Sequence, residues 1–79
     1  MNKLEQYKNL VITTNTETIL ANIDLIQKYS ERISKCKKHE YAQYFQNDIE
    51  RCEKIINELK QENVEYLEEI NKVKEMKEV

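Results

Sequence analysis

The residue types most capable of chemistry are scarce in this chain, which has one histidine and two cysteines among 79 residues. Cys36 and His39 are three residues apart, so they would share one face of a helix, and Cys52 could in principle join them. Tetrahedral zinc usually takes four ligands with a recognisable second pair. Because that pair is missing, the sequence predicts no metal site and no cofactor. Both cysteines are expected to be small buried hydrophobic residues in a reduced protein.

The carboxylates are numerous, but their arrangement does not indicate catalysis. Most of the glutamates in the C-terminal half alternate with lysine at helical spacing, which is typical of a solvated helix face. Nucleophilic catalysis needs a nucleophile, a base within reach and oxyanion donors, often at a strand-to-helix turn. The sequence provides none of that context, so we expect no enzymatic activity.

The composition predicts the class of element that must position these side chains. Glycine and proline are both absent, and 35% of the residues are charged. A fold with tight hairpin turns would use glycine and proline, whereas long amphipathic helices do not need them. The sequence therefore predicts an all-α fold and a single helical domain over 1–79. A chain of this size has a thin core, so pairing with a second copy or a partner is expected.

A continuous apolar stripe runs through the C-terminal half at alternating steps of four and three residues. This spacing is the heptad pattern of a helix lying along another helix. Asn63 lies in the middle of the stripe, where a polar residue can fix the register. The stripe consists of Phe45, Ile49, Cys52, Ile56, Leu59, Asn63, Tyr66, Ile70, Val73 and Lys77.

Three helices are predicted, over about 2–12, 16–45 and 48–78. The first is separated from the second by a polar stretch in which Thr14-x-x-Glu17 matches a capping box. In the second helix the residues expected to face the C-terminal stripe include Ile19, Ile23, Ile26 and Ile33. The complete predicted packing stripe is Ile19, Ile23, Ile26, Ile33, Ile49, Cys52, Ile56, Leu59, Asn63, Tyr66, Ile70 and Val73.

An antiparallel hairpin of the two long helices can turn at either of two positions. A turn near 46–48 places Ile19 opposite Val73, Ile33 opposite Leu59, and Ser30 opposite Asn63. A turn near residue 39 instead places Ile26 opposite Lys54 and Ile19 opposite Gln61, so apolar residues would meet polar or charged ones. The sequence therefore predicts a hairpin that turns at 46–48, with coiled-coil-like packing, in a dimeric helical bundle. A parallel coiled-coil dimer through the C-terminal stripe is the alternative.

One segment carries most of the features expected of a binding surface. A basic run ends in Lys35, Lys37 and Lys38, and an aromatic cluster of Tyr41, Tyr44 and Phe45 follows it. Aromatic residues anchor interfaces because they bury a large area with few rotatable bonds. These six residues are the predicted partner-binding site. The alternatives are that the aromatic residues only fill the turn and that the lysines only complement the acidic helix.

We expect a small non-enzymatic protein–protein interaction module, a regulator or inhibitor that occludes a surface of a larger protein target. Its size and composition resemble those of phage- or plasmid-encoded regulators. The alternatives are a self-associating coiled-coil scaffold and an RNA-binding hairpin dimer. The net charge of −2 disfavours binding to nucleic acid in general.

The sequence also bears on where the protein acts. No apolar run approaches the roughly 20 residues of a membrane-spanning helix. The first residues, 1–5, lack the apolar core of a signal peptide. We therefore expect a cytoplasmic protein with no membrane partner.

Overall fold

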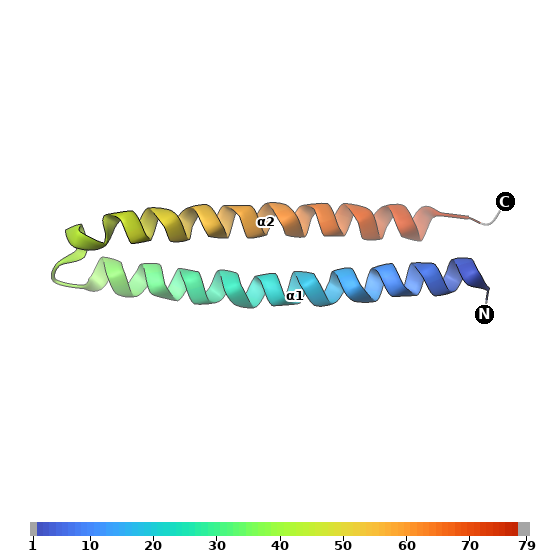
Figure 1. The fold of residues 1–79 in the computed structure, drawn as a ribbon, viewed down its shortest axis with the longest axis horizontal. Coiled ribbons are helices and arrows are strands. Elements are labelled where there is room, and N and C mark those ends of the chain that lie inside the picture. The colour runs from blue at the N-terminus through green and yellow to red at the C-terminus, as the bar shows by residue number, and fades with distance from the viewer. Residues whose placement is uncertain (1, 78–79) are drawn as a thin grey trace.

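The computed structural model describes residues 2–77, which form two long antiparallel helices. Helix α1 is Lys3–Lys38 and helix α2 is Gln46–Glu75, and the 3-10 helix η1, Ala42–Phe45, lies in the turn between them. Figure 1 shows α1 and α2 side by side, with the start of α1 and the end of α2 away from the turn. The described residues measure 62 × 16 × 11 Å, with a radius of gyration of 18.1 Å. A compact domain of this length would have a radius of about 12 Å, so the hairpin is strongly elongated.

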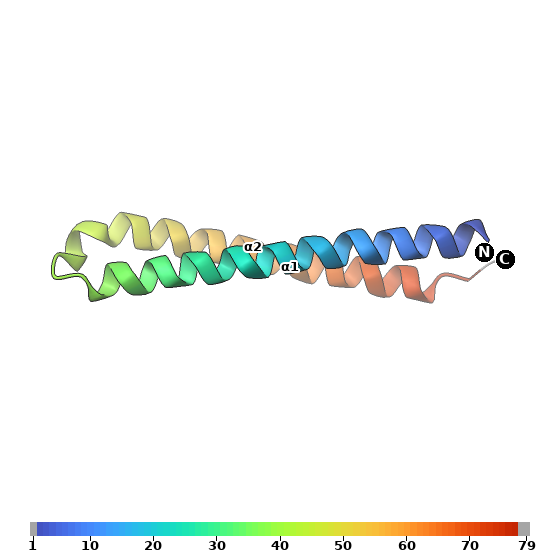
Figure 2. The ribbon, with the colours of Figure 1, turned by 90° about the horizontal axis from the view of Figure 1, so that it is seen from below.

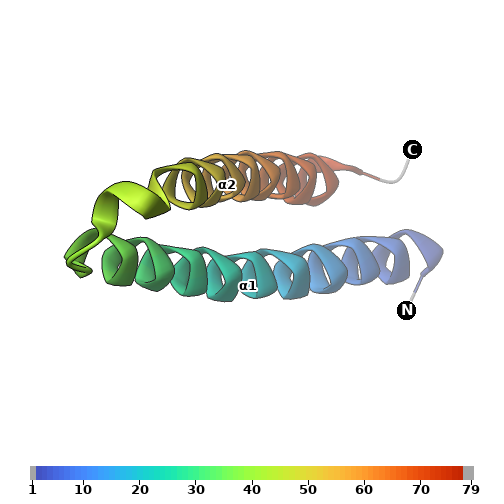
Figure 3. The ribbon, with the colours of Figure 1, turned by 60° about the vertical axis from the view of Figure 1, so that its left-hand side comes forward.

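The two helices stay together along their length. Figure 2 shows that they cross at a shallow angle, and Figure 3 shows η1 as a short separate coil that connects their ends. Within residues 2–77, neither helix combines the length and the apolar composition needed to cross a membrane.

Helix α1 is continuous, so the predicted break between a short helix at 2–12 and a helix starting at 16 was wrong. The hydroxyl of Thr14 donates to the carbonyls of Leu10 and Val11 at 2.9 and 3.3 Å, and the hydroxyl of Thr18 donates to the carbonyl of Thr14 at 3.0 Å. Hydroxyl groups can bond in this way inside a helix as well as at its start. The N-cap is instead Asn2, whose side-chain oxygen accepts from the Glu5 N–H at 2.8 Å.

The turn lies earlier than predicted. Helix α1 ends at Lys38 rather than at residue 45, and α2 begins at Gln46 rather than at 48. Three lysines occupy the last turn of α1, where positive charge interacts favourably with the helix dipole. Helix α2 ends at Glu75, with Met76 as its cap. Residue 78, the predicted end of this helix, lies outside the described residues.

The register of the helices is defined by a hydrogen bond between two asparagines. The side-chain nitrogen of Asn22 donates to the side-chain oxygen of Asn63 at 2.9 Å. Stepping along both helices from this pair at heptad spacing places Ile19 opposite Tyr66, and Ile33 opposite Cys52. The predicted partners were Val73 for Ile19 and Leu59 for Ile33, so each isoleucine meets a residue that lies seven positions earlier in α2 than predicted. Asn63 therefore pairs with Asn22 and not with Ser30.

The core is a single narrow seam between the helices. In the described part of the chain, the buried hydrophobic side chains all come from α2: Ile49, Cys52, Ile56, Ile70 and Val73. Two asparagines of α1, Asn15 and Asn22, are buried with them. The side-chain nitrogen of Asn15 donates to the carbonyl of Tyr66 at 3.4 Å, so both buried amides have a partner across the seam.

Candidate protein-binding surface

A series of hydrogen bonds begins at the end of α1 and continues through the turn. The His39 N–H donates to the carbonyl of Cys36 at 3.3 Å, and the Ala42 N–H donates to the carbonyl of His39 at 3.1 Å. The Tyr41 N–H donates to Nδ1 of His39 at 3.0 Å. Since no described residue has a positive φ angle, the turn forms without glycine.

The aromatic rings of the turn form a connected cluster, hereafter the tip cluster: His39, Tyr41, Tyr44 and Phe45. The ring of Phe45 meets that of His39 edge to face at 5.2 Å. The ring of Tyr41 lies 5.9 Å from His39 and 6.0 Å from Tyr44. These separations are in the range of favourable aromatic pairs, so each ring helps to position the next.

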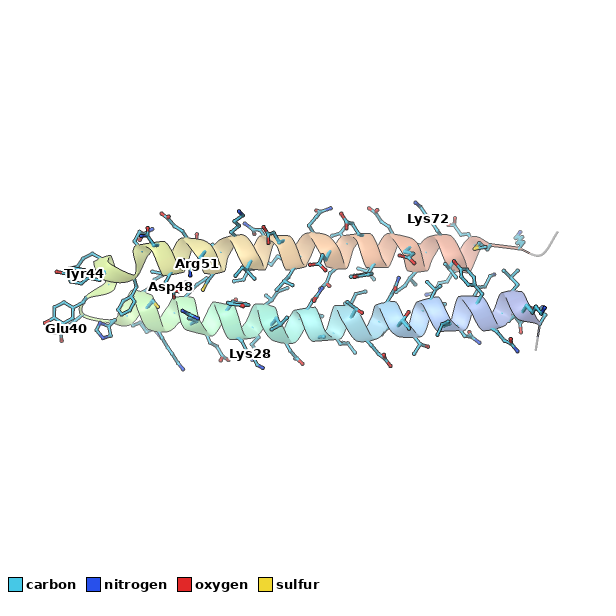
Figure 4. All side chains as sticks on the ribbon, viewed as in Figure 1. Lys28, Glu40, Tyr44, Asp48, Arg51 and Lys72 are labelled. Carbon is cyan, nitrogen blue, oxygen red and sulfur yellow. The ribbon has the colours of Figure 1, made fainter. Side chains whose placement is uncertain are left out.

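The rings differ in their exposure to solvent, so some of them serve the fold and others are accessible to a partner. Phe45 is half-buried, whereas Tyr41 is 52% exposed and Tyr44 is 77% exposed. Figure 4 shows Tyr44 and Glu40 at the turn end, pointing away from the helices. Of the three predicted aromatic binding residues, Phe45 therefore faces the fold, and the two tyrosines face solvent.

The predicted lysines lie beside the tip cluster in the last turn of α1. Lys35, Lys37 and Lys38 are all exposed. Lys37 is 3.9 Å from a carboxylate oxygen of Glu53, which partly neutralises its charge. The turn end therefore combines exposed tyrosines with positive charge.

A charged brace that the sequence analysis did not identify joins the helices next to the tip cluster. Nε and Nη2 of Arg32 donate to the two carboxylate oxygens of Asp48 at 2.8 and 2.7 Å. The thiol of Cys36 also donates to Asp48, at 3.8 Å. Asp48 is in the first turn of α2, where a carboxylate is favoured by the helix dipole. The sequence did contain a signal for this ion pair, because Asp48 is an acidic residue at a predicted helix start that follows the basic segment containing Arg32.

The brace and burial change the protonation of the groups around Asp48. The hydrogen bond from Arg32 to Asp48, together with the negative charge of that carboxylate, raises the pKa of Arg32. Burial raises the pKa of the Cys36 thiol, and the charge of Asp48 and its hydrogen bond raise it further. Both cysteines are free thiols. The thiol of Cys36 is therefore a weak nucleophile at neutral pH.

The predicted packing residues lie in three environments. Ile49, Cys52, Ile56, Ile70 and Val73 are buried, and Ile19, Ile26, Ile33, Leu59, Asn63 and Tyr66 are half-buried. Ile23 is instead 47% exposed, because Asn22 takes the position between the helices that Ile23 was expected to fill. Ser30 is likewise exposed, and its neighbour Tyr29 is half-buried.

Residues 2–77 contain no pocket and no group of three or more His, Cys, Asp and Glu that could hold a metal ion. The features with binding potential are therefore on the outer surface. Comparison of the chain with known protein families, curated proteins and solved structures gives no match.

Proposed function

We propose that this protein is a non-enzymatic protein–protein interaction module that binds a larger protein through its turn end. It acts as a regulator or inhibitor by covering a surface of that target, as a dimer and in the cytoplasm. The binding residues are Tyr41 and Tyr44, with Lys35, Lys37 and Lys38 beside them. Phe45 is half-buried and supports the cluster through its ring contact with His39.

The observation that carries the proposal is the exposure of Tyr44 on an ordered turn. This large side chain is 77% exposed, yet hydrogen bonds and ring contacts fix the segment that carries it. An aromatic side chain has few rotatable bonds and therefore loses little conformational entropy on binding, and tyrosine is common at the energetic centre of interfaces. Lysines next to it favour a target with an acidic rim.

The two alternatives make different use of the same hairpin. A self-associating scaffold would use the long faces of the helices and not the tip cluster. An RNA-binding dimer would use the basic end of α1, but Arg32 and Lys37 are each paired with a carboxylate. That pairing lowers the positive charge available to phosphate, so the protein target is favoured.

The test is affinity capture from cells that make the protein naturally, with the full chain as bait. Tyr44→Ala should raise the Kd for the target about 30-fold or more, the effect of losing a contact worth at least 2 kcal/mol, and should lower recovery of the target accordingly. The matched control is Tyr7→Ala, which removes a tyrosine that is 50% exposed at the other end of α1. This control should retain full capture.

Circular dichroism of both variants separates a binding effect from a folding effect. If Tyr44→Ala keeps its helicity and still captures the target at the wild-type level, the tip is not the binding site. Recovery of RNA that falls steeply with salt would instead favour the nucleic-acid alternative.

A further inference from the structure

One long face of the hairpin carries exposed apolar residues from both helices. Leu20 and Ile23 of α1 are 57% and 47% exposed, and Val64 and Leu67 of α2 are 46% and 50% exposed. Lys37 of α1 and Glu53 of α2 form an ion pair on one side of the seam. Ile23 lies two heptads before Lys37, and Leu67 lies two heptads after Glu53, so both are on the same side of the seam as that ion pair. Leu20 and Val64 each lie three residues earlier, which is one turn away on the same face. These four residues are hereafter the apolar face.

The α1 residues that continue this face carry no charge over five helical turns. A solvated helix in a chain that is 35% charged would be expected to place lysine or glutamate at several of these positions. Such a surface can be covered without removing a charge from water, which is the main cost of burying a helix flank. The uncharged α1 residues are Thr13, Thr16, Leu20, Ile23, Gln27, Ser30 and Ser34.

The opposite face of the hairpin has a different charge pattern. It carries the Arg32–Asp48 brace, and α2 continues it with Glu58, Glu62, Glu65 and Glu69 at steps of four, three and four. A second copy docked there would bring four glutamates per chain into the contact. The apolar face also has charges on its α2 side, but they are of both signs and include Glu53, Lys60 and Lys74. The uninterrupted run of glutamates therefore disfavours the opposite face, and the apolar face is the better suited of the two to contact with an identical surface.

We infer that a second copy of this chain covers the apolar face and that the two hairpins form a two-fold symmetric four-helix bundle. In a two-fold interface the same patch is used by both subunits, so it must be self-complementary. An uncharged, apolar patch near the middle of the hairpin satisfies this condition, and its position lets the hairpins overlap over much of their length. The inference specifies the surface for the dimer in the proposed function and rests on that dimer.

The small core is the reason why the occupant is a second copy. Five hydrophobic side chains are buried in the described residues, and a pair of helices with so few gains stability by covering more apolar area. A copy of the same chain is present wherever the protein is made, whereas a target need not be. The dimer can therefore stabilise the fold before any target is bound.

Sedimentation equilibrium of the full chain tests the inference, with a mass of two chains expected for the wild type. Leu20→Lys places like charges in the symmetric contact and should weaken the dimer at least tenfold. The matched control is Leu10→Lys, which removes a leucine that is 63% exposed on the same helix. Leu10 lies one heptad before Glu17 and points outward with it, so this variant should remain dimeric.

A second experiment, in which two variants of opposite charge are mixed, tests the inference even if Leu20→Lys is poorly folded. An equimolar mixture of Leu20→Lys and Leu20→Glu should recover the helicity and the mass of a dimer, because opposite charges then meet across the interface. A wild-type protein that is monomeric at the highest concentration measured would overturn the inference. A dimer that Leu10→Lys dissociates while Leu20→Lys does not, or a mixture that shows no recovery, would also overturn it.

Failure of this inference can be told apart from failure of the proposed function. Dimerisation is measured on the purified chain, and target binding is measured by capture with the Tyr44 and Tyr7 variants. A monomeric wild type that still captures its target through Tyr44 would remove the dimer and leave the binding tip in place.

Discussion

In the half of the hairpin next to the turn, apolar side chains occupy successive layers, whereas the half next to the chain ends has asparagines in the same seam. The register places Ile33 opposite Cys52 and Tyr29 opposite Ile56 near the turn, with the Arg32–Asp48 brace beside them. Farther from the turn, Asn22 meets Asn63, and Asn15 lies opposite Ile70.

The two halves therefore contribute differently to the fold. Apolar layers supply most of the stability, because burial of apolar surface is the dominant favourable term. Polar layers contribute less stability but disfavour pairings in which an amide would lose its partner. We expect the turn half to hold the helices together and the other half to fix which residues face each other.

The largest effect should come from removing a buried isoleucine in each half. Ile56→Ala should lower the free energy of unfolding by about 2–5 kcal/mol, as is usual for a cavity in a packed core. Ile70→Ala removes the same atoms but lies in a layer with Asn15, so its cost should be at the lower end of this range. Chemical denaturation at one fixed protein concentration measures both. Equal costs would show that the halves contribute equally.

Substitution of the asparagine pair should produce the next largest effect. Asn63→Leu leaves the buried amide of Asn22 without its partner, which should cost about 1–3 kcal/mol. The double variant Asn22→Leu/Asn63→Leu should be at least as stable as the wild type, but its amide NMR spectrum should show more than one set of signals. A double variant with a single sharp set of signals would mean that the turn fixes the register without the asparagines.

Asp48→Asn should have a smaller effect on stability, confined to the turn half. The Arg32 guanidinium is exposed to solvent, and water screens its interaction with the carboxylate. We expect a small decrease in melting temperature, together with faster amide hydrogen exchange at the start of α2. Glu53→Gln, which removes the longer contact with Lys37, is the control and should have less effect. Unchanged exchange in Asp48→Asn would show that the brace does not order the turn.

The smallest effect on stability should appear at alkaline pH. The folded pKa of Cys36 is raised above its ordinary value by burial and by Asp48, so folding favours the protonated thiol. This stability is present below the pKa of the unfolded chain and is lost as the pH rises through the folded pKa. Comparison of wild type with Cys36→Ser at neutral and alkaline pH isolates the contribution.

Alkylation of Cys36, followed by mass spectrometry, measures the same shift directly. The reaction should reach its half-maximal rate at a higher pH in the folded chain than in the chain unfolded by urea. Asp48→Asn should move the folded profile to lower pH, because it removes the carboxylate while burial remains. Coincident profiles for the folded and unfolded chains would contradict the assignment.

The sequence was sufficient for the fold class and for the face of α2 that meets α1. Absence of glycine and proline indicated long helices, and the stripe from Ile49 to Val73 is buried or half-buried throughout. The predicted packing face of α1 was wrong where an apolar residue is exposed and a polar neighbour is buried. Ile23 is apolar and exposed, whereas Asn22 is polar and buried, because the pair with Asn63 satisfies its amide.

The register could not be obtained from the stripe because a heptad repeat fits its partner almost equally well after a shift of seven residues. The turn decides between such alternatives, and the residues around it are ordinary helix formers such as Glu40, Ala42 and Gln43. The lysines that end at Lys38 were a signal for a helix end there, but the apolar layers of the predicted register favoured the later turn. The residues of the proposed binding surface were predicted as a group, but the inward position of Phe45 depends on its contact with His39.

The start of α1 and the end of α2 both lie opposite the turn, and this placement determines how the hairpin would respond to a pulling force. A load applied at residues 2 and 77 acts on one layer of the seam at a time, so the helices would unzip instead of shearing. The bond from Lys8 to the carbonyl of Met76 and the asparagine layers would open first. The apolar layers and the brace beside the turn would open last, so the tip would remain intact until nearly the whole hairpin had separated.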